Sequence, residues 1–177
     1  MISEKWDEKV IELAKSLINC QSYSGHEDKA AEALKAYMKV AGVFDEIETD
    51  CYGNVIGHIK GKNPGSKVLF DGHIDTVPVG NLKDWKHDPF HAVVEDGKLY
   101  GRGAADMKGA VAAFTVAAHR YAVENGKNFA GDVYVASVVH EECFEGVAAR
   151  KISAKVKPDY VVIGEASEMN LKVGQRG

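Results

Sequence analysis

The chain has 177 residues, of which 45% are hydrophobic and 27% are charged, and its formal net charge is −4 at pH 7. A chain of this length can form one domain with a sizeable hydrophobic core. The negative charge and the lack of a basic run argue against nucleic acid or an anionic membrane as the main partner. No apolar run approaches the ~18 residues of a membrane span, and the acidic N-terminal residues do not resemble a signal peptide.

The three cysteines, Cys20, Cys51 and Cys143, are widely spaced. An odd number at such spacing does not predict a disulfide framework, so we expect a protein of the reducing cytoplasm. Cys143 follows two glutamates, and we expect a packed, unreactive thiol there in preference to a nucleophile.

Apolar periodicity predicts both helices and strands. Helical spacing covers residues 6–18, 24–41, 110–125 and 148–155. Strand-like runs cover residues 44–49, 55–59, 68–70, 132–139, 159–163 and 171–173, with a hairpin over 91–100. This order predicts an α/β fold with a mostly parallel sheet flanked by helices.

Two local patterns mark expected boundaries. Ser24 and Glu27 have the spacing of a capping box at the start of the second helix, and Gly42 can end that helix. Residues 63–66, Asn-Pro-Gly-Ser, predict a turn before the central strand.

The central predicted strand ends in polar residues. Val68, Leu69 and Phe70 are followed by His73 and Asp75. On a continuing strand these two side chains share a face about 6.6 Å apart, at roughly 3.3 Å per residue. That arrangement suits a histidine that binds a metal through one ring nitrogen while a carboxylate holds the other, although a satisfied strand-end histidine is an equally simple interpretation of this pair alone.

Two further predicted strands also end in acids. Residues 132–139 lead to Glu141 and Glu142, and residues 159–163 lead to Glu165. Ligands of open α/β sheets bind outside the carboxyl ends of the strands, so these groups can converge on one site. Glu141 and Glu142 can both enter it only if the strand ends there, because neighbours on a strand face opposite sides.

A glycine-rich stretch, Gly101 to Gly109, precedes the third helix and contains Asp106. Its spacing fits neither the dinucleotide-binding glycine pattern nor a Walker loop. Asp106 can be a helix N-cap, but the glycines also allow a close backbone approach to a ligand.

So many carboxylates in one cleft require cations. Two carboxylates ~4 Å apart repel by about 4 kcal/mol at an effective dielectric of 20. A carboxylate and imidazole set suits zinc, cobalt or manganese. A pair of such ions can hold a water molecule between them and polarise a carbonyl, and one surplus glutamate can serve as a general base.

Five ordered motifs carry a resemblance to a known family, and they cover nearly the whole chain. The chain resembles the dinuclear-zinc amidohydrolases and metallopeptidases that include acetylornithine deacetylase, succinyl-diaminopimelate desuccinylase, aminoacylase and glutamate carboxypeptidase, with some likeness to the selenium-metabolism-linked hydrolases. The motifs are residues 71–78, 85–90, 100–109, 141–142 and 164–165.

The resemblance implies four metal ligands. His73 and Glu165 would bind one zinc ion, Asp106 would bridge, and Glu142 would bind the second ion. It also implies a cis peptide between Asp106 and Met107.

The resemblance implies two further roles at the site. Asp75 would orient His73, and Glu141 would be the general base. The implied activity is cleavage of the amide bond of a small N-acyl amino acid or peptide, with two Zn2+ ions per complete site and Co2+ or Mn2+ as possible substitutes.

Members of this family are about twice as long as this chain. Residues 1–177 are therefore expected to be the N-terminal part of a zinc-exopeptidase-like catalytic domain, incomplete because it ends at a Gly-Gln-Arg-Gly junction to a lid domain. The lid, through which the full-length protein would form a homodimer, and a later histidine ligand of the second metal would be missing; His140 is the nearest substitute. Two alternatives stay open, which are a non-catalytic metal-binding remnant and a purely structural α/β domain.

Overall fold

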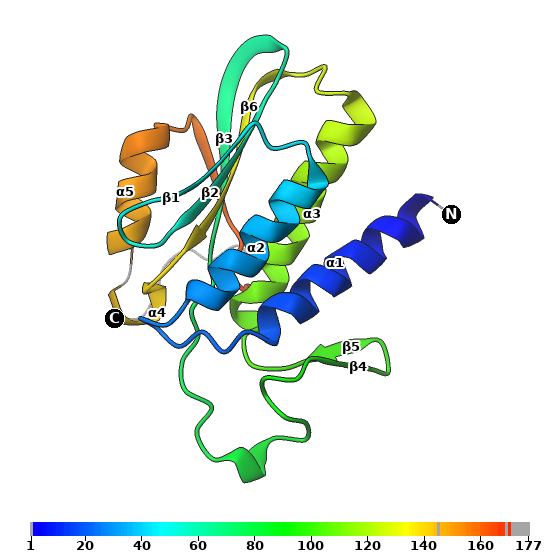
Figure 1. Cartoon of the computed structure of the whole chain (residues 1–177), viewed down its shortest axis with the longest axis vertical. Helices are drawn as coiled ribbons and strands as arrows, with labels where there is room; N and C mark the ends of the chain where they lie inside the picture. The colour runs from blue at the N-terminus through cyan, green and yellow to red at the C-terminus, as the bar shows by residue number, and fades with distance from the viewer. Residues whose placement is uncertain (1, 145, 169, 171–177) are drawn as a thin grey trace.

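The centre of the fold is a five-stranded sheet with helices on both faces (Figure 1). The computed structural model describes residues 2–144, 146–168 and 170. In spatial order the strands are β1 (Glu46–Thr49), β2 (Val55–Lys60), β6 (Ala130–Val138), β3 (Asn63–His73) and β7 (Tyr160–Ile163).

The sheet is mixed. β3 pairs in parallel with β6 and β7, whereas β2 pairs antiparallel with β1 and β6. The parallel pairing predicted from the sequence therefore holds for the three strands whose ends carry the predicted site. The predicted strand over 171–173 and the glycine-rich junction after it lie outside the described residues.

Three long helices lie on one face of the sheet, and a shorter one lies on the other (Figure 1). The long helices are α1 (Ile2–Ile18), α2 (Asp28–Ala41) and α3 (Gly109–Asn125), and the shorter one is α5 (Val147–Val156). The remaining elements are the hairpin β4 (Val93–Glu95) and β5 (Lys98–Tyr100), the short helix α4 (Glu141–Phe144), and the turns η1 (Leu82–Asp84) and η2 (Ala104–Lys108).

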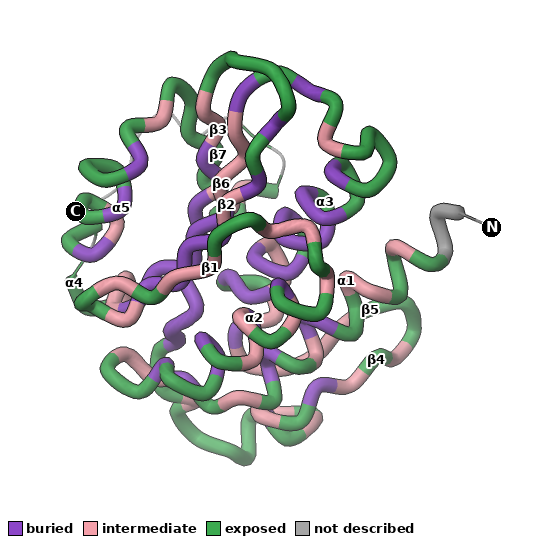
Figure 2. Tube along the Cα trace, turned by 45° about the horizontal axis from the view of Figure 1, so that its top comes forward, coloured by how far each residue is buried: buried purple, intermediate pink, exposed green. Residues whose placement is uncertain are grey.

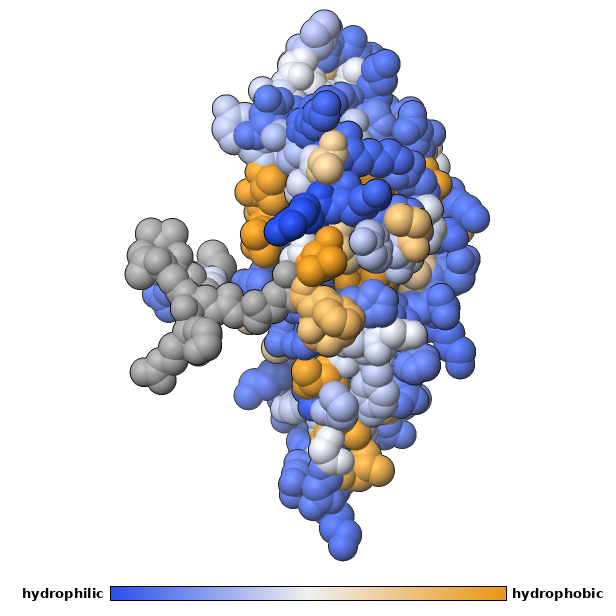
Figure 3. All heavy atoms as spheres, turned by 90° about the vertical axis from the view of Figure 1, so that its left-hand side faces the viewer, coloured by the Kyte–Doolittle hydropathy of each residue, from blue (hydrophilic) through white to orange (hydrophobic). Residues whose placement is uncertain are grey.

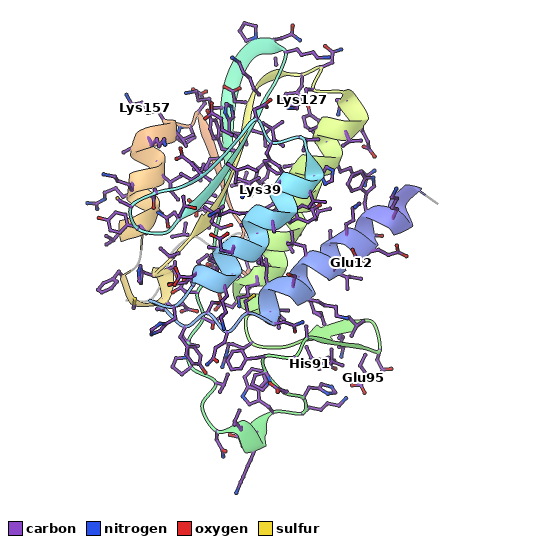
Figure 4. The ribbon with its side chains drawn as sticks, in the orientation of Figure 1. Glu12, Lys39, His91, Glu95, Lys127 and Lys157 are labelled. Carbon is purple, nitrogen blue, oxygen red and sulfur yellow. The ribbon has the colours of Figure 1, made fainter. Side chains whose placement is uncertain are left out.

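The helices are amphipathic, as their sequence spacing predicted. In α2, Leu34 and Met38 are fully buried, and burial of such a side chain stabilises the fold by about 1.5–3 kcal/mol. Exposed charged residues such as Glu12 and Lys39 occupy the outer sides of α1 and α2 (Figure 4). Buried residues accordingly concentrate on the sheet and on the helix sides that face it (Figure 2).

The predicted helix stop is confirmed, but the predicted helix start is not. Gly42 ends α2 in a left-handed conformation with φ of 68°, which glycine adopts without steric cost. The N-cap position of α2 has no side-chain cap hydrogen bond, so the capping box is wrong. The Ser24 hydroxyl instead donates to Oδ2 of Asp75 at 2.6 Å, and Glu27 contacts backbone N–H groups outside the helix.

The predicted turn over residues 63–66 belongs to β3, which begins at Asn63. The register of β3 against β6 shifts between Asn63 and Lys67. A Cβ on Gly65 would lie 2.6 Å from the backbone nitrogen of Gly131. The glycine therefore permits a close backbone approach at an irregular strand start, where the sequence pattern indicated a break.

The edge strand β7 carries an exposed apolar run. Tyr160 is 64% exposed and Ile163 is 66% exposed. The face in Figure 3, which is the left-hand side of Figure 1 where α5 lies, shows apolar side chains among hydrophilic ones.

None of the described helices combines the length and apolar character needed to span a bilayer.

Candidate metal centre

His73 is the last residue of β3, and its buried ring faces several carboxylates. Its Nε2 lies 3.0 Å from Oδ1 of Asp106 and 3.4 Å from Oε1 of Glu165. Oε2 of Glu141 lies 3.8 Å from the same nitrogen. The groups that follow β3, β6 and β7 therefore converge at the carboxyl ends of the parallel strands, as the sequence predicted.

Within the part of the chain that the structure describes, the acids and His73 form two overlapping groups that could hold a metal ion. In each group one ligand atom per residue lies within 4.8 Å of the others. The groups are His73, Asp106 and Glu142, and His73, Glu141 and Glu165. Imidazole nitrogen and carboxylate oxygen together suit zinc, cobalt or manganese, so the donor set fits the expected ions.

Asp75 contacts the His73 ring through both its backbone and its carboxylate. Nδ1 of His73 lies 3.0 Å from the backbone oxygen of Asp75 and 3.4 Å from its Oδ1. Because a carbonyl oxygen only accepts, Nδ1 carries the proton and Nε2 is left to face the acids. The backbone of Asp75 thus contributes to an orientation that the sequence analysis assigned to its carboxylate.

Neighbouring charged groups and hydrogen bonds shift the pKa values of His73 and Asp75. Burial disfavours a charged ring, but contacts with Asp75 and Glu165 outweigh it and raise the pKa of His73 to about 11. Burial also opposes charge on Asp75, but hydrogen bonds from His73 and Ser24 hold its pKa below the usual value. Without a metal the centre therefore favours a proton on the imidazole.

β6 ends at Val138 and Glu141 and Glu142 begin the short helix α4, so the strand does end there, as their shared entry into one site required. Their backbone N–H groups donate to Oδ1 and Oδ2 of Asp75, each at 3.1 Å. The helical turn places both side chains on the side of the centre, which neighbours on a strand could not achieve. Burial raises the pKa of both glutamates.

Asp106 is not the N-cap of α3, because α3 begins at Gly109 and its N-cap position has no side-chain hydrogen bond. The peptide bond between Asp106 and Met107 is cis, as the family resemblance implied. The side chain of Lys108 anchors this segment, since its Nζ donates to the backbone oxygens of Leu17 and Cys20 at 2.8 Å each. Burial lowers the pKa of Lys108 to about 8.

The sequence analysis did not predict that Lys108 and Asp71, which are close in sequence to the site residues, would be buried ionisable groups. Lys108 shares the helical spacing of the buried Val111, Ala112 and Thr115, and a lysine in a buried stripe could have indicated its anchoring role. Asp71 precedes His73 by two residues, and burial raises its pKa to about 6. Its place inside an apolar strand was the available signal.

The motif over residues 85–90, which contains Trp85, and His140 contribute to neither candidate metal group among the described residues. Trp85 packs within its own loop, because Nε1 donates to the Val79 oxygen at 2.8 Å and the ring lies 4.9 Å from the Arg102 guanidinium. All three cysteines are free, but Cys143 is exposed, so the expectation of a packed thiol is wrong.

Fold and site together define a class of protein: an α/β domain with a carboxylate and imidazole metal centre at the carboxyl ends of its parallel strands. A profile described as peptidase family M20/M25/M40 matches residues 69–176. The chain belongs to this family of metal-dependent hydrolases.

Two relatives in sequence are succinyl-diaminopimelate desuccinylases. The one from Beijerinckia indica subsp. indica is 36% identical over 186 residues, which cover 96% of this chain and 48% of that protein. The one from Wolbachia pipientis subsp. Culex pipiens is 35% identical over 179 residues, covering 94% and 44%. The chain therefore spans about half the length of these relatives.

Solved structures share the fold. The M20 family metallo-carboxypeptidase Sso-CP2 from Sulfolobus solfataricus matches with a TM-score of 0.68 and 25% identity, over 90% of this chain and 37% of that chain. Human carnosine dipeptidase 1 matches with a TM-score of 0.69 and 23% identity, over 92% and 39%. At that identity the second likeness concerns the fold alone.

Proposed function

We propose that this chain carries part of the active site of a two-metal hydrolase that cleaves the amide bond of a small N-acyl amino acid or peptide. The observation that carries the proposal is the buried His73 ring, whose Nε2 lies 3.0–3.8 Å from the carboxylates of Asp106, Glu165 and Glu141. Such a concentration of acids around one imidazole is stable only with a proton or a cation among them.

The residues that would hold the ions are His73, Asp106, Glu142 and Glu165. Asp106 would bridge, with His73 and Glu165 on one ion and Glu142 on the other. Zn2+ is the proposed metal, and Co2+ or Mn2+ would also suit these donors. When bound, the ions supply positive charge that polarises an amide carbonyl and lowers the pKa of water.

Glu141 is the proposed general base. Burial raises the pKa of its carboxyl, which brings a carboxylate closer to the range where proton transfer is efficient. Glu141 would take a proton from the attacking water as the new carbon–oxygen bond forms. It would then pass that proton to the amide nitrogen as the carbon–nitrogen bond breaks and the amine departs.

The substrate class rests on the relatives. The similar proteins are described as succinyl-diaminopimelate desuccinylases and a metallo-carboxypeptidase, names that indicate cleavage of an N-acyl or peptide bond. Because the chain spans about half of the desuccinylases, the reaction is proposed for a protein in which this centre is complete.

A second candidate function is metal binding without turnover. Both candidate groups use the same His73 ring, so among the described residues one histidine serves two potential sites. A centre with a single histidine could retain an ion without the ligands needed for catalysis.

Metal binding and hydrolysis measured on one preparation test the proposal. We expect the purified chain to bind Zn2+ and to gain thermal stability from it, and we expect His73→Ala to abolish both effects. His119→Gln is a matched control, because His119 is buried but contacts Tyr37 and not the acids. Metal binding that survives His73→Ala would refute the proposed centre, and binding with no hydrolysis of N-succinyl or N-acetyl amino acids in any preparation would favour the second function.

A further inference from the structure

Four consecutive backbone N–H groups, those of residues 139–142, each donate to a side-chain oxygen from elsewhere in the chain. The acceptors are Oδ1 of Asn54 for Val139 at 3.0 Å, Oε1 of Glu27 for His140 at 3.0 Å, Oδ1 of Asp75 for Glu141 at 3.1 Å and Oδ2 of Asp75 for Glu142 at 3.1 Å. We call these three side chains the acceptor cradle. Asn54 precedes β2, Glu27 precedes α2 and Asp75 follows β3, so three separate parts of the chain hold one turn.

All three side chains of the acceptor cradle are buried. Asn54 and Asp75 are 0% exposed, and Glu27 is 5% exposed. Buried N–H groups need partners, because an unsatisfied one costs roughly the full desolvation of the group. Hydrogen bonds to ionised carboxylates are also stronger than those between neutral groups. The cradle therefore stabilises the turn at which α4 begins, next to Glu141 and Glu142.

His140 is the most constrained residue of this turn. Its φ is 58°, in the left-handed region that residues other than glycine rarely adopt. Such a conformation persists only where surrounding contacts enforce it. Oε1 of Glu27 accepts the N–H of His140 and lies 3.7 Å from its Nδ1, so a side chain from a distant part of the sequence contacts the strained residue directly.

Glu27 has no competing role as a helix cap. It occupies the N-cap position of α2, where no side-chain cap hydrogen bond forms. Its Oε1 accepts from Gly25 at 3.0 Å and from His140 at 3.0 Å. The carboxylate thus joins the segment before α2 to the turn after β6, and it belongs to neither candidate metal group.

We propose that Glu27 is a positioning residue that holds residue 140 in its left-handed conformation and thereby places the Glu141–Glu142 pair at the metal centre. The role in the centre rests on the proposed function, whereas the hold on the turn can be measured without a metal. Glu27 would act through the backbone, without touching substrate or ion.

Three variants separate positioning from general stability. Glu27→Leu removes the acceptor at similar size. Glu27→Gln keeps a carbonyl oxygen in the place of Oε1, the atom that both N–H groups use. His140→Gly combined with Glu27→Leu removes the steric cost of the left-handed conformation. Leu34→Ala, in the buried core of α2, is the matched control for lost stability because it leaves the acceptor cradle intact.

Two readouts are needed. Hydrogen exchange of the amides of residues 139–142 in the metal-free chain reports the hold on the turn. Titration with Co2+, followed by visible absorption and equilibrium dialysis, reports the centre. We expect Glu27→Leu to lose amide protection and to bind Co2+ about 10–100-fold more weakly, the usual cost of changing a group behind the ligands. Glu27→Gln and the double variant should recover much of both, and Leu34→Ala should lower the melting temperature without changing the affinity.

The outcomes distinguish this proposal from the proposed function. If the wild-type chain binds no Co2+, the proposed function fails, and amide exchange alone then decides whether Glu27 holds the turn. Unchanged protection in Glu27→Leu overturns the positioning role. Lost amide protection in Glu27→Leu with unchanged Co2+ affinity and spectrum also overturns it, because the turn would then not position the ligands of the centre. If Glu27→Leu does not fold, loss of both amide protection and Co2+ affinity in Glu27→Gln overturns it as well.

Discussion

Nε2 of His73 lies 3.0 Å from Oδ1 of Asp106, across the gap between the end of β3 and the segment before α3. A nitrogen and a carboxylate oxygen at this separation share a proton or flank a cation. Nδ1 of His73 already donates to the Asp75 backbone. A proton on Nε2 therefore makes the ring an imidazolium, which agrees with its pKa of about 11 in the metal-free protein.

Metal binding should release a proton from His73. The neutral imidazole is the form that binds a metal, while the raised pKa keeps the free centre protonated at neutral pH. Protons thus compete with the ion, and affinity should rise with pH by up to about tenfold per unit near neutrality. Calorimetric titrations with Zn2+ in two buffers of different ionisation enthalpy would measure the release. Identical heats in the two buffers would contradict a protonated His73.

Glu141 and Glu142 should respond differently to loss of charge. In a preparation with measurable hydrolysis, Glu141→Gln should retain its metal and lose roughly 10²–10⁴ in rate, the usual contribution of a general base. Glu142→Gln should lose metal affinity as well as rate. Metal analysis beside kinetics checks both. Because Glu141 also lies in a candidate metal group, metal loss in Glu141→Gln would make it a ligand and not the base.

Asp75→Asn should weaken metal binding about 10–100-fold. Both oxygens of Asp75 accept hydrogen bonds from the backbone of α4. An amide nitrogen in either place would face a partly buried N–H donor and leave it without that acceptor, at a cost of up to about 1–3 kcal/mol. Ser24→Ala, which removes only the hydroxyl bonded to Oδ2, should have a smaller effect. Equal metal affinities and melting temperatures in the wild type and Asp75→Asn would show that Asp75 neither orients His73 nor holds the turn.

Strand-end chemistry made much of the site predictable. His73 ends β3 and Glu165 follows β7, and parallel strands bring their carboxyl ends to one edge of the sheet. Asp106 was also a candidate, because the glycines around it allow an irregular backbone that can approach a ligand. The family resemblance then gave it a role as a metal ligand. Helix positions followed from periodicity, since one side of each helix must face the sheet.

The contacts of Ser24 and Glu27 and the turn at α4 could not be predicted from the sequence, because they depend on tertiary contacts. Ser24 and Glu27 have capping-box spacing, but their side chains bond to Asp75 and to the backbone of Gly25 and His140. A local pattern gives no information on a competing acceptor or donor 51 or 113 residues away. The turn at α4 was missed for the same reason, because the acceptors that hold it lie on distant segments.

β7, the last strand of the sheet among the described residues, should promote self-association. β7 presents a run of four exposed apolar residues, and an open apolar strand edge is a template for pairing with another chain. Tyr160→Lys should reduce association, because a charge at an edge strand opposes pairing. Val40→Lys is the control, since Val40 is 88% exposed but lies on α2. Sedimentation of the three proteins would decide; equal association in Tyr160→Lys and the wild type would show that β7 is not the contact.

Residues 1–177 should bind about one zinc ion tightly and show no useful hydrolysis. Both candidate metal groups depend on His73, so an ion held by His73 leaves carboxylates alone for a second. Oxygen donors without an imidazole would leave that ion largely hydrated and weakly held. Glu141 is also 35% exposed at its side chain, so water reaches the proposed base. Efficient hydrolysis also requires that the substrate be held in position, which can supply ~7 kcal/mol or more of a barrier. Zinc titration with a parallel assay of N-acyl amino acids would measure both properties. Two tight sites with turnover would mean that another group completes the second site, with His140 the first to replace by alanine.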